Sequence, residues 1–108
     1  QMRADLMCRY PDVVKQMAES GLAWAMIGFE SGSQRILDLF EKETTVEENL
    51  RAAAICKEYG IKVWANVMFG APTETRAEVM ETVRTISAAA TLRRHQAAAW
   101  RRKWEKRG

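Results

Sequence analysis

Apolar and polar positions follow two recurring patterns along the chain, one typical of buried strands and one typical of amphipathic helices. Residues 22–29 (LAWAMIGF) and 61–69 (IKVWANVMF) are apolar at most positions. Runs of this length and composition are expected for parallel strands that are covered on both faces. The large side chains of these runs are therefore predicted to pack in the core: Trp24, Met26, Trp64 and Met68.

Helical patterns separate and follow the two predicted strands. The segment YPDVVKQMAESG predicts a helix with Pro11 in its first turn and Gly21 at its end. Ser33 is placed to cap a short helix that runs through Phe40. Two longer helices each start at a capping box, formed by Thr45 with Glu48 and by Thr75 with Glu78.

The order of elements indicates the fold class. The opening residues QMRADLM have no cap and are interpreted as the end of a strand that begins upstream. The order is then strand, helix, strand, helix, strand, helix, which implies parallel pairing through right-handed crossovers. The fold class is therefore α/β, and the sheet belongs either to an open doubly wound fold or to part of a (βα) barrel.

Composition limits the size and the surroundings of the protein. With 108 residues the chain is at most one globular domain. It contains no apolar run near the roughly 20 residues of a membrane helix and no signal-peptide layout, so a cytoplasmic protein without a membrane partner is expected. Cys8 and Cys56 lie far apart in the sequence and are predicted to be buried, reduced thiols without a disulfide.

Positive charge is concentrated at the end of the sequence. Residues 92–108 contain seven Lys and Arg against one Glu, a net charge of +6, so residues 1–91 carry −3 of the total of +3. We predict a basic tail at 92–108 that is helical or disordered. Its arginines, interleaved with Trp100 and Trp104, suit nucleic-acid binding, although a solvated basic helix is the commoner explanation of such a pattern.

Candidate chemistry lies where the two predicted strands end, at GFESGS and FGAPTET. In both parallel architectures, ligands bind beyond the carboxyl ends of the strands. Gly28, Gly32 and Gly70 leave room for a ligand beside the backbone, while Glu30 and Ser31 supply hydrogen-bonding groups. These features predict a pocket for a polar small molecule that carries hydroxyl groups.

Other classes of site lack their motifs. The sequence contains neither GxGxxG nor a P-loop, and its single histidine, His95, lies in the basic tail. Acid–base chemistry by two carboxylates would have to use Glu30 and Glu74, whose separation the sequence does not fix. No catalytic residue and no metal ligand is assigned.

These motifs together resemble a known family. The segments RAD, GLAWAMIGFESGSQRIL, EKETT and CKEYGIKVWANVMFGAPTET, within about residues 1–86, are similar to the second half of a radical S-adenosylmethionine (radical SAM) barrel. The best match is the subgroup that often carries a cobalamin-binding domain. The resemblance implies a partial TIM-type barrel over residues 1–91 and a parent enzyme that uses S-adenosylmethionine and a [4Fe-4S] cluster. Cobalamin is a possible further cofactor of the parent enzyme, and the sequence does not decide whether it is used. In such enzymes the cluster supplies one electron, and a 5′-deoxyadenosyl radical abstracts hydrogen from the substrate.

The resemblance also implies cofactor contacts at the strand ends. Glu30 and Ser31 would contact the ribose or the methionine part of S-adenosylmethionine. Met68, Phe69 and Gly70 would lie against the adenine.

Two further residues come from the flanks of these motifs. Arg3, at the end of the preceding predicted strand, would face the carboxylate of the cofactor. Glu74 matches the family's Pro-x-Glu acid, a role that helix capping alone would also explain.

The chain departs from the family in its cysteines. The CxxxCxxC cluster motif is missing, and Cys8 and Cys56 do not have the spacing to replace it. We therefore expect a truncated portion of such an enzyme, or a divergent gene fragment, that retains part of the cofactor site and is inactive alone. The alternative is a small α/β binding or interaction module with a nucleic-acid-contacting tail. Open sheet edges would favour self-association or pairing with the missing half of the barrel.

Overall fold

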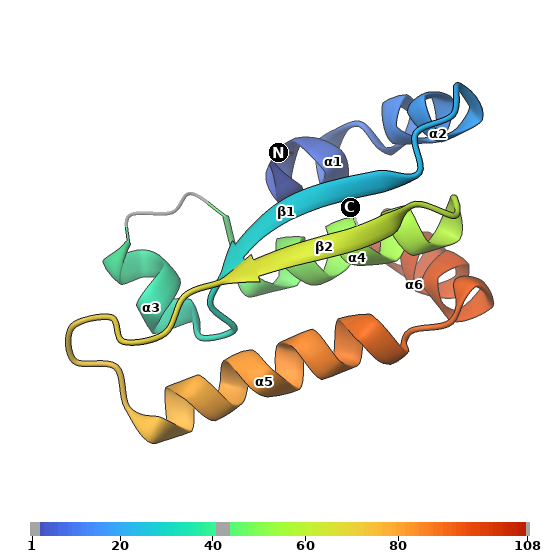
Figure 1. The fold of residues 1–108 in the computed structure, drawn as a ribbon. Helices are drawn as coiled ribbons and strands as arrows, with labels where there is room; N and C mark the ends of the chain where they lie inside the picture. The colour runs from blue at the N-terminus through green and yellow to red at the C-terminus, as the bar shows by residue number, and fades with distance from the viewer. Residues whose placement is uncertain (1–2, 41–43, 108) are drawn as a thin grey trace.

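The computed structural model describes residues 3–40 and 44–107 and shows an α/β arrangement in which helices pack on one face of a small sheet (Figure 1). The elements follow in the order α1 (Ala4–Arg9), α2 (Pro11–Glu19), β1 (Trp24–Glu30), α3 (Gln34–Leu39), α4 (Val46–Glu58), β2 (Lys62–Val67), α5 (Arg76–Thr91) and α6 (Arg94–Arg107). None of the helices in these described ranges has the length and apolar character needed to cross a bilayer.

The two strands pair in parallel, as the sequence predicts. Trp24 lies opposite Lys62 at the start of the sheet, and Gly28 lies opposite Asn66 near its end. Because the helices α3 and α4 connect the strands, both strands point the same way and end at the same edge (Figure 1). The α/β class is confirmed, and the architecture is consistent with part of a radical SAM fold, whereas a complete barrel is not shown.

The core lies between one face of the sheet and the helices. Ala25, Ile27 and Phe29 alternate along β1 and are buried, and they pack in one cluster with α1, α2 and α4. Their spacing of two residues places them on the same face of the strand. The helix α4 adds a nearly continuous buried stripe: Ala52, Ala53, Ile55 and Cys56.

The other face of the sheet is open, which corrects the prediction that both faces are buried. Trp24, Met26 and Trp64 are exposed, as is Met68 beyond the end of β2. The two tryptophan rings lie 6.1 Å apart between centroids, and the ammonium of Lys62 lies 5.7 Å from the Trp24 ring. Along β1, Trp24 and Met26 alternate with the buried Ala25, Ile27 and Phe29, so they lie on the opposite face of the strand. Self-association through this face stays a prediction.

The N-terminal segment is a second correction. Residues 4–9 form the helix α1 instead of the end of a strand, and the described residues contain two strands instead of three. Ala4 and Met7 lie one turn apart and are both buried, with Asp5 in the first turn. This spacing supports a helix even though the sequence shows no capping side chain before it.

The two predicted capping boxes are present, whereas Ser33 precedes α3 without the predicted side-chain cap, and its hydroxyl donates to the Glu78 carboxylate instead. At α4 the hydroxyl of Thr45 accepts from the Glu48 N–H (3.1 Å), and Glu48 Oε1 accepts from the Thr45 N–H (3.0 Å). The same capping box opens α5 at Thr75 and Glu78. Gly21 has a φ of 108°, which only glycine adopts readily, and it stops the chain from continuing α2.

The basic C-terminal segment forms a helix that is docked on the rest of the protein. Arg101 makes two hydrogen bonds to the carboxylate of Glu58, at 2.6 and 2.9 Å, and Arg94 Nε donates to the Glu58 carbonyl at 2.6 Å. A small buried cluster joins α4 to this segment: Ala54, Leu92 and Ala97. The domain division after residue 91 and nucleic-acid binding by the tail stay predictions.

Candidate functional site

The carboxyl ends of β1 and β2 form one edge, which we call the strand-end edge: Glu30, Ser31, Met68, Phe69 and Gly70. The Met68 N–H donates to the Glu30 carbonyl (2.8 Å), so the two loops leave the sheet side by side. Glu30 has a φ of 63°, a left-handed conformation that is uncommon for a residue with a side chain. It coincides with the register shift between Gly28 and Glu30 and turns the chain out of the sheet.

The loop after β1 is fastened to α5. Ser31 is fully buried, its hydroxyl accepts from the Ser33 N–H (3.0 Å), and it lies 3.2 Å from the hydroxyl of Thr82. The Gly32 N–H donates to the same Thr82 hydroxyl at 2.9 Å. The hydroxyl of Ser31 therefore holds this loop in place, and a direct contact between Ser31 and a cofactor stays a prediction.

Gly32 serves close packing instead of ligand access. A Cβ atom at this position would lie 2.5 Å from Thr85 Oγ1 and 2.6 Å from both Glu81 O and Thr82 Cα. Real Cβ atoms do not approach backbone this closely, so only glycine lets the loop lie against α5.

The loop after β2 is closed by Glu74. Gly70 has a φ of 87°, and its N–H donates to Glu74 Oε1 at 2.8 Å. The second carboxylate oxygen, Oε2, is buried and has no hydrogen-bond partner among the described residues. Met68 and Phe69, just before this turn, are more than half exposed. The loop thus combines a bare apolar surface with an unsatisfied acceptor.

Arg35 connects the two loops through Glu78. Its guanidinium binds both oxygens of the Glu78 carboxylate, at 2.5 and 2.6 Å, and also donates to the hydroxyl and the carbonyl of Thr73, at 3.1 and 2.8 Å. Glu78 also accepts from the hydroxyls of Ser33 and Thr75. Sequence reasoning found Glu78 as a helix cap and missed Arg35, because the pair is 43 residues apart and no local pattern links them.

The contacts of Glu78 predict a pH dependence of stability. The Arg35 guanidinium, together with the Thr75 N–H, lowers the pKa of Glu78 from 4.5 to about 2. Because the folded protein binds this proton less tightly than the unfolded chain, the stabilisation is complete above pH 4.5 and is lost as the pH falls towards 2. We expect Glu78→Gln to flatten the fall in unfolding free energy over this window in urea denaturation at stepped pH. Equal pH slopes for the wild type and the variant would contradict this assignment.

Arg3 does not lie at a strand end. It precedes α1, with an exposed side chain that donates from Nη2 to Asp5 Oδ2 (2.8 Å) and from Nε to Asp5 Oδ1 (3.2 Å). The predicted position is wrong because the segment that follows Arg3 is a helix. Its contact with a cofactor carboxylate stays a prediction.

The cysteines are poor candidates for metal ligands. Cys56 is fully buried, Cys8 is partly buried, and both are free thiols. Burial raises the pKa of each to about 12, so both are protonated near neutral pH, whereas a metal ligand must be a thiolate. Among the side chains that the structure describes, in residues 3–40 and 44–103, no group of three or more His, Cys, Asp or Glu is placed to hold a metal ion.

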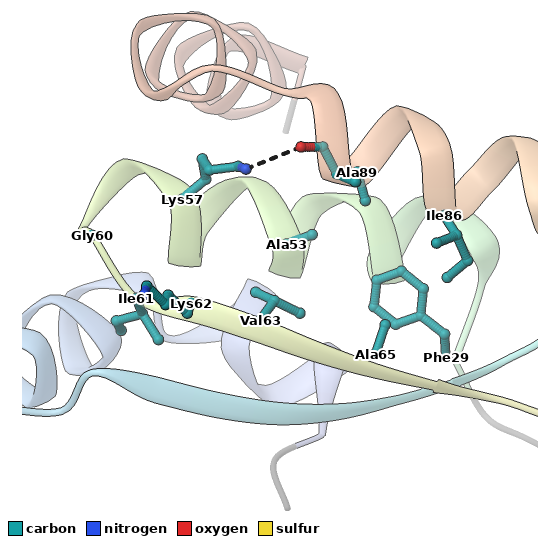
Figure 2. A pocket seen from close by; sticks show the side chains of 11 residues that line it. Phe29, Ala53, Lys57, Gly60, Ile61, Lys62, Val63, Ala65, Ile86 and Ala89 are labelled. Carbon is teal, nitrogen blue, oxygen red and sulfur yellow. Dashed lines mark hydrogen bonds between the residues drawn. The ribbon is translucent and has the colours of Figure 1, made fainter.

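A separate cavity of about 380 Å³ lies on the helix-covered side of β2, between this strand, α4 and α5 (Figure 2). Its lining is mainly apolar, with contributions from Phe29, Val63, Ala65 and Ile86. Lys57 Nζ donates to the Ala90 carbonyl at its rim (3.3 Å). The cavity shares no lining residue with the strand-end edge and offers an apolar space of a different chemical character.

Comparison with known proteins decides the family. The model of the Radical SAM superfamily matches residues 3–86. The chain belongs to the radical SAM superfamily. This confirms the resemblance of the sequence motifs, and the matched residues include both loops of the strand-end edge.

Individual relatives of this radical SAM chain are enzymes of several kinds. An uncharacterized methyltransferase of Pyrococcus horikoshii is 35% identical over 72 residues, covering 67% of this chain and 16% of that protein. An anaerobic magnesium-protoporphyrin IX monomethyl ester cyclase of Cereibacter sphaeroides is 36% identical over 76 residues, covering 70% of this chain and 12% of the relative. The enzyme of the same name from Rubrivivax gelatinosus is 38% identical over 64 residues, covering 59% of this chain and 12% of the relative. The chain therefore spans about a sixth or less of these relatives.

Proposed function

We propose that this radical SAM chain supplies part of an S-adenosylmethionine site at the strand-end edge. The observation that carries the proposal is the meeting of the two loops, joined by the hydrogen bond from the Met68 N–H to the Glu30 carbonyl. Parallel α/β proteins bind their ligands at this edge of the sheet. The superfamily uses S-adenosylmethionine, and the family match includes both loops.

The residues at this edge fit the two halves of the cofactor. Met68 and Phe69 are 52% and 55% exposed and offer an apolar surface on which an adenine ring can pack. Glu74 Oε2 is buried without a partner, and a ribose hydroxyl or an ammonium group would supply the donor that it lacks. When bound, S-adenosylmethionine would supply a sulfonium, which releases a carbon-centred radical and a thioether only when a separate reductant delivers one electron.

The residues do not fit the iron–sulfur cluster that the superfamily implies. A [4Fe-4S] cluster is bound by cysteine thiolates, and the chain has two cysteines, Cys8 and Cys56, with pKa values raised to about 12. Cys8 donates its S–H to the Glu48 carbonyl on α4. The proposal is therefore confined to cofactor binding, while the radical reaction and cobalamin use stay predictions for a longer parent enzyme.

Ligand-observed NMR tests this proposal. We expect saturation transfer from the protein to the adenine protons of millimolar S-adenosylmethionine. We expect Phe69→Ser to reduce this transfer by about half or more, because the variant loses the aromatic ring on which the adenine stacks. Val13→Ser, which replaces another exposed apolar residue, 45% exposed and on α2, is the control and should leave the transfer unchanged. Absence of transfer to wild-type protein, or equal loss in both variants, would refute the proposal.

A further inference from the structure

Arg35 and Glu78 join the two loops that the proposed cofactor site needs. Arg35 lies at the start of α3, directly after the first loop, and Glu78 lies in the first turn of α5, directly after the second. We propose that Arg35 and Glu78 are a positioning pair that sets the spacing of the two loops before any ligand binds. This inference rests on the proposed S-adenosylmethionine site and adds a role that neither loop can perform alone.

The second loop is held through Thr73. Arg35 Nη1 donates to the Thr73 hydroxyl and Nη2 donates to the Thr73 carbonyl, so the guanidinium binds both the side chain and the backbone of this residue. Thr73 has a φ of 66°, which is strained for a β-branched residue and persists only where neighbours hold it. One residue later, Glu74 closes the turn on the Gly70 N–H. Arg35 thus acts directly on the loop that carries Gly70.

The first loop is held through Ser33 and Thr82. The Ser33 hydroxyl donates to Glu78 Oε2 (3.3 Å), and one helical turn further along α5 the Thr82 hydroxyl accepts from the Gly32 N–H. Ser31, Ser33, Glu78 and Thr82 are all buried, where hydrogen bonds are shielded from water and reinforce one another. The start of α5 is therefore a common platform for both loops.

The guanidinium suits a positioning role better than ligand binding. All three of its nitrogen atoms donate to Glu78 or Thr73. Its planar fork matches a carboxylate with two parallel hydrogen bonds, a geometry that the single ammonium of lysine cannot reproduce. Arg35→Lys is therefore expected to retain the positive charge but to lose the fixed spacing between the two loops.

The structure offers a matched control for the loss of an Arg–Glu pair. Arg101 binds the carboxylate of Glu58 with the same two-bond geometry, at the C-terminal end of α4, and joins α6 to α4 instead of the two loops. Arg101→Met should destabilise the protein to a similar degree as Arg35→Met without disturbing the strand-end edge.

Hydrogen exchange and ligand titration of these variants test the pairing role. In the absence of ligand, Arg35→Met should speed amide exchange of Gly32 and Gly70 by about tenfold, the loss expected for a charged hydrogen-bonded pair, and Arg101→Met should leave both amides unchanged. S-adenosylmethionine affinity should fall about tenfold in Arg35→Met and in Arg35→Lys, and remain at the wild-type value in Arg101→Met. The exchanged pair Arg35→Glu with Glu78→Arg should recover part of the affinity.

The outcomes distinguish the positioning role of the Arg35–Glu78 pair from the existence of the S-adenosylmethionine site. Unchanged exchange at Gly32 and Gly70 in Arg35→Met would overturn the positioning role. So would equal losses of affinity in Arg35→Met and Arg101→Met, because that result reports general destabilisation. If the wild-type protein binds no S-adenosylmethionine, the proposed function fails, and the exchange experiment still decides whether the pair holds the loops.

Discussion

Gly32→Ala is expected to lower the free energy of unfolding by about 3 kcal/mol, at the upper end of what overpacking usually costs. The added methyl group would lie 2.5–2.6 Å from atoms of α5, and two of the three atoms that it meets, Glu81 O and Thr82 Cα, belong to the backbone. Backbone atoms cannot move aside as the end of a flexible side chain can, so the loop must separate from the helix to relieve these contacts. Urea denaturation measures the loss.

Two variants separate the clash from other effects of an alanine. Gly60→Ala adds the same methyl group in open space, where only its φ of 77° opposes the change, and should cost about 1 kcal/mol. Thr85→Ala removes the side-chain oxygen that lies nearest to the added methyl group and should not rescue Gly32→Ala. Equal costs for Gly32→Ala and Gly60→Ala, or rescue by Thr85→Ala, would show that the loop does not lie against the backbone of α5.

Phe29→Ala is expected to cost about 3–5 kcal/mol, the usual range for truncating a buried aromatic ring. The side chain is 1% exposed, belongs to the main core and lies beside Ala65 and Ile86 at the cavity of Figure 2. Its loss would enlarge this cavity. Because a domain of this size has about 5–15 kcal/mol of stability, much of the protein should unfold at temperatures that the wild type tolerates.

Met26→Ala on the same strand is the control. Met26 points to the open face and is 41% exposed, so its truncation should cost below about 1 kcal/mol. The difference between the two variants measures how unequally the two faces of β1 are covered. Similar costs would contradict the open face and would indicate that another segment or a second copy of the chain covers it. Thermal unfolding followed by circular dichroism provides the comparison.

Local signals in the sequence predicted most of the elements and failed where tertiary context decides. The capping boxes at Thr45 and Thr75 and the glycine stop at Gly21 were readable because each depends on residues within one turn. The two parallel strands followed from apolar runs. The same runs predicted two buried faces, and Trp24 and Trp64 show the limit of this inference. The composition of a strand shows that it is suited to burial, whereas the actual burial of each face depends on which other segments pack against it.

The sequence predicted the position of the candidate site but not the hydrogen bonds and close contacts within it. Parallel topology alone placed Glu30 and Gly70 at one edge, and the structure brings their loops together. The roles of Gly32 and Arg35 could not be predicted, because each depends on where α5 lies relative to the first loop. Arg3 was misplaced because Ala4 and Met7 were not recognised as one face of a short helix.

The most direct test of the central claim is to map S-adenosylmethionine onto the ¹⁵N-labelled chain by chemical-shift perturbation. With ligand raised to about 5 mM, a range that detects millimolar affinity, we predict that shifts are confined to residues 30–35 and 67–75. The cavity beneath α5, with Ala53 and Ile61 in its lining, should not respond. Shifts centred on that cavity, or no shifts at all, would contradict the assignment of the strand-end edge as a cofactor site.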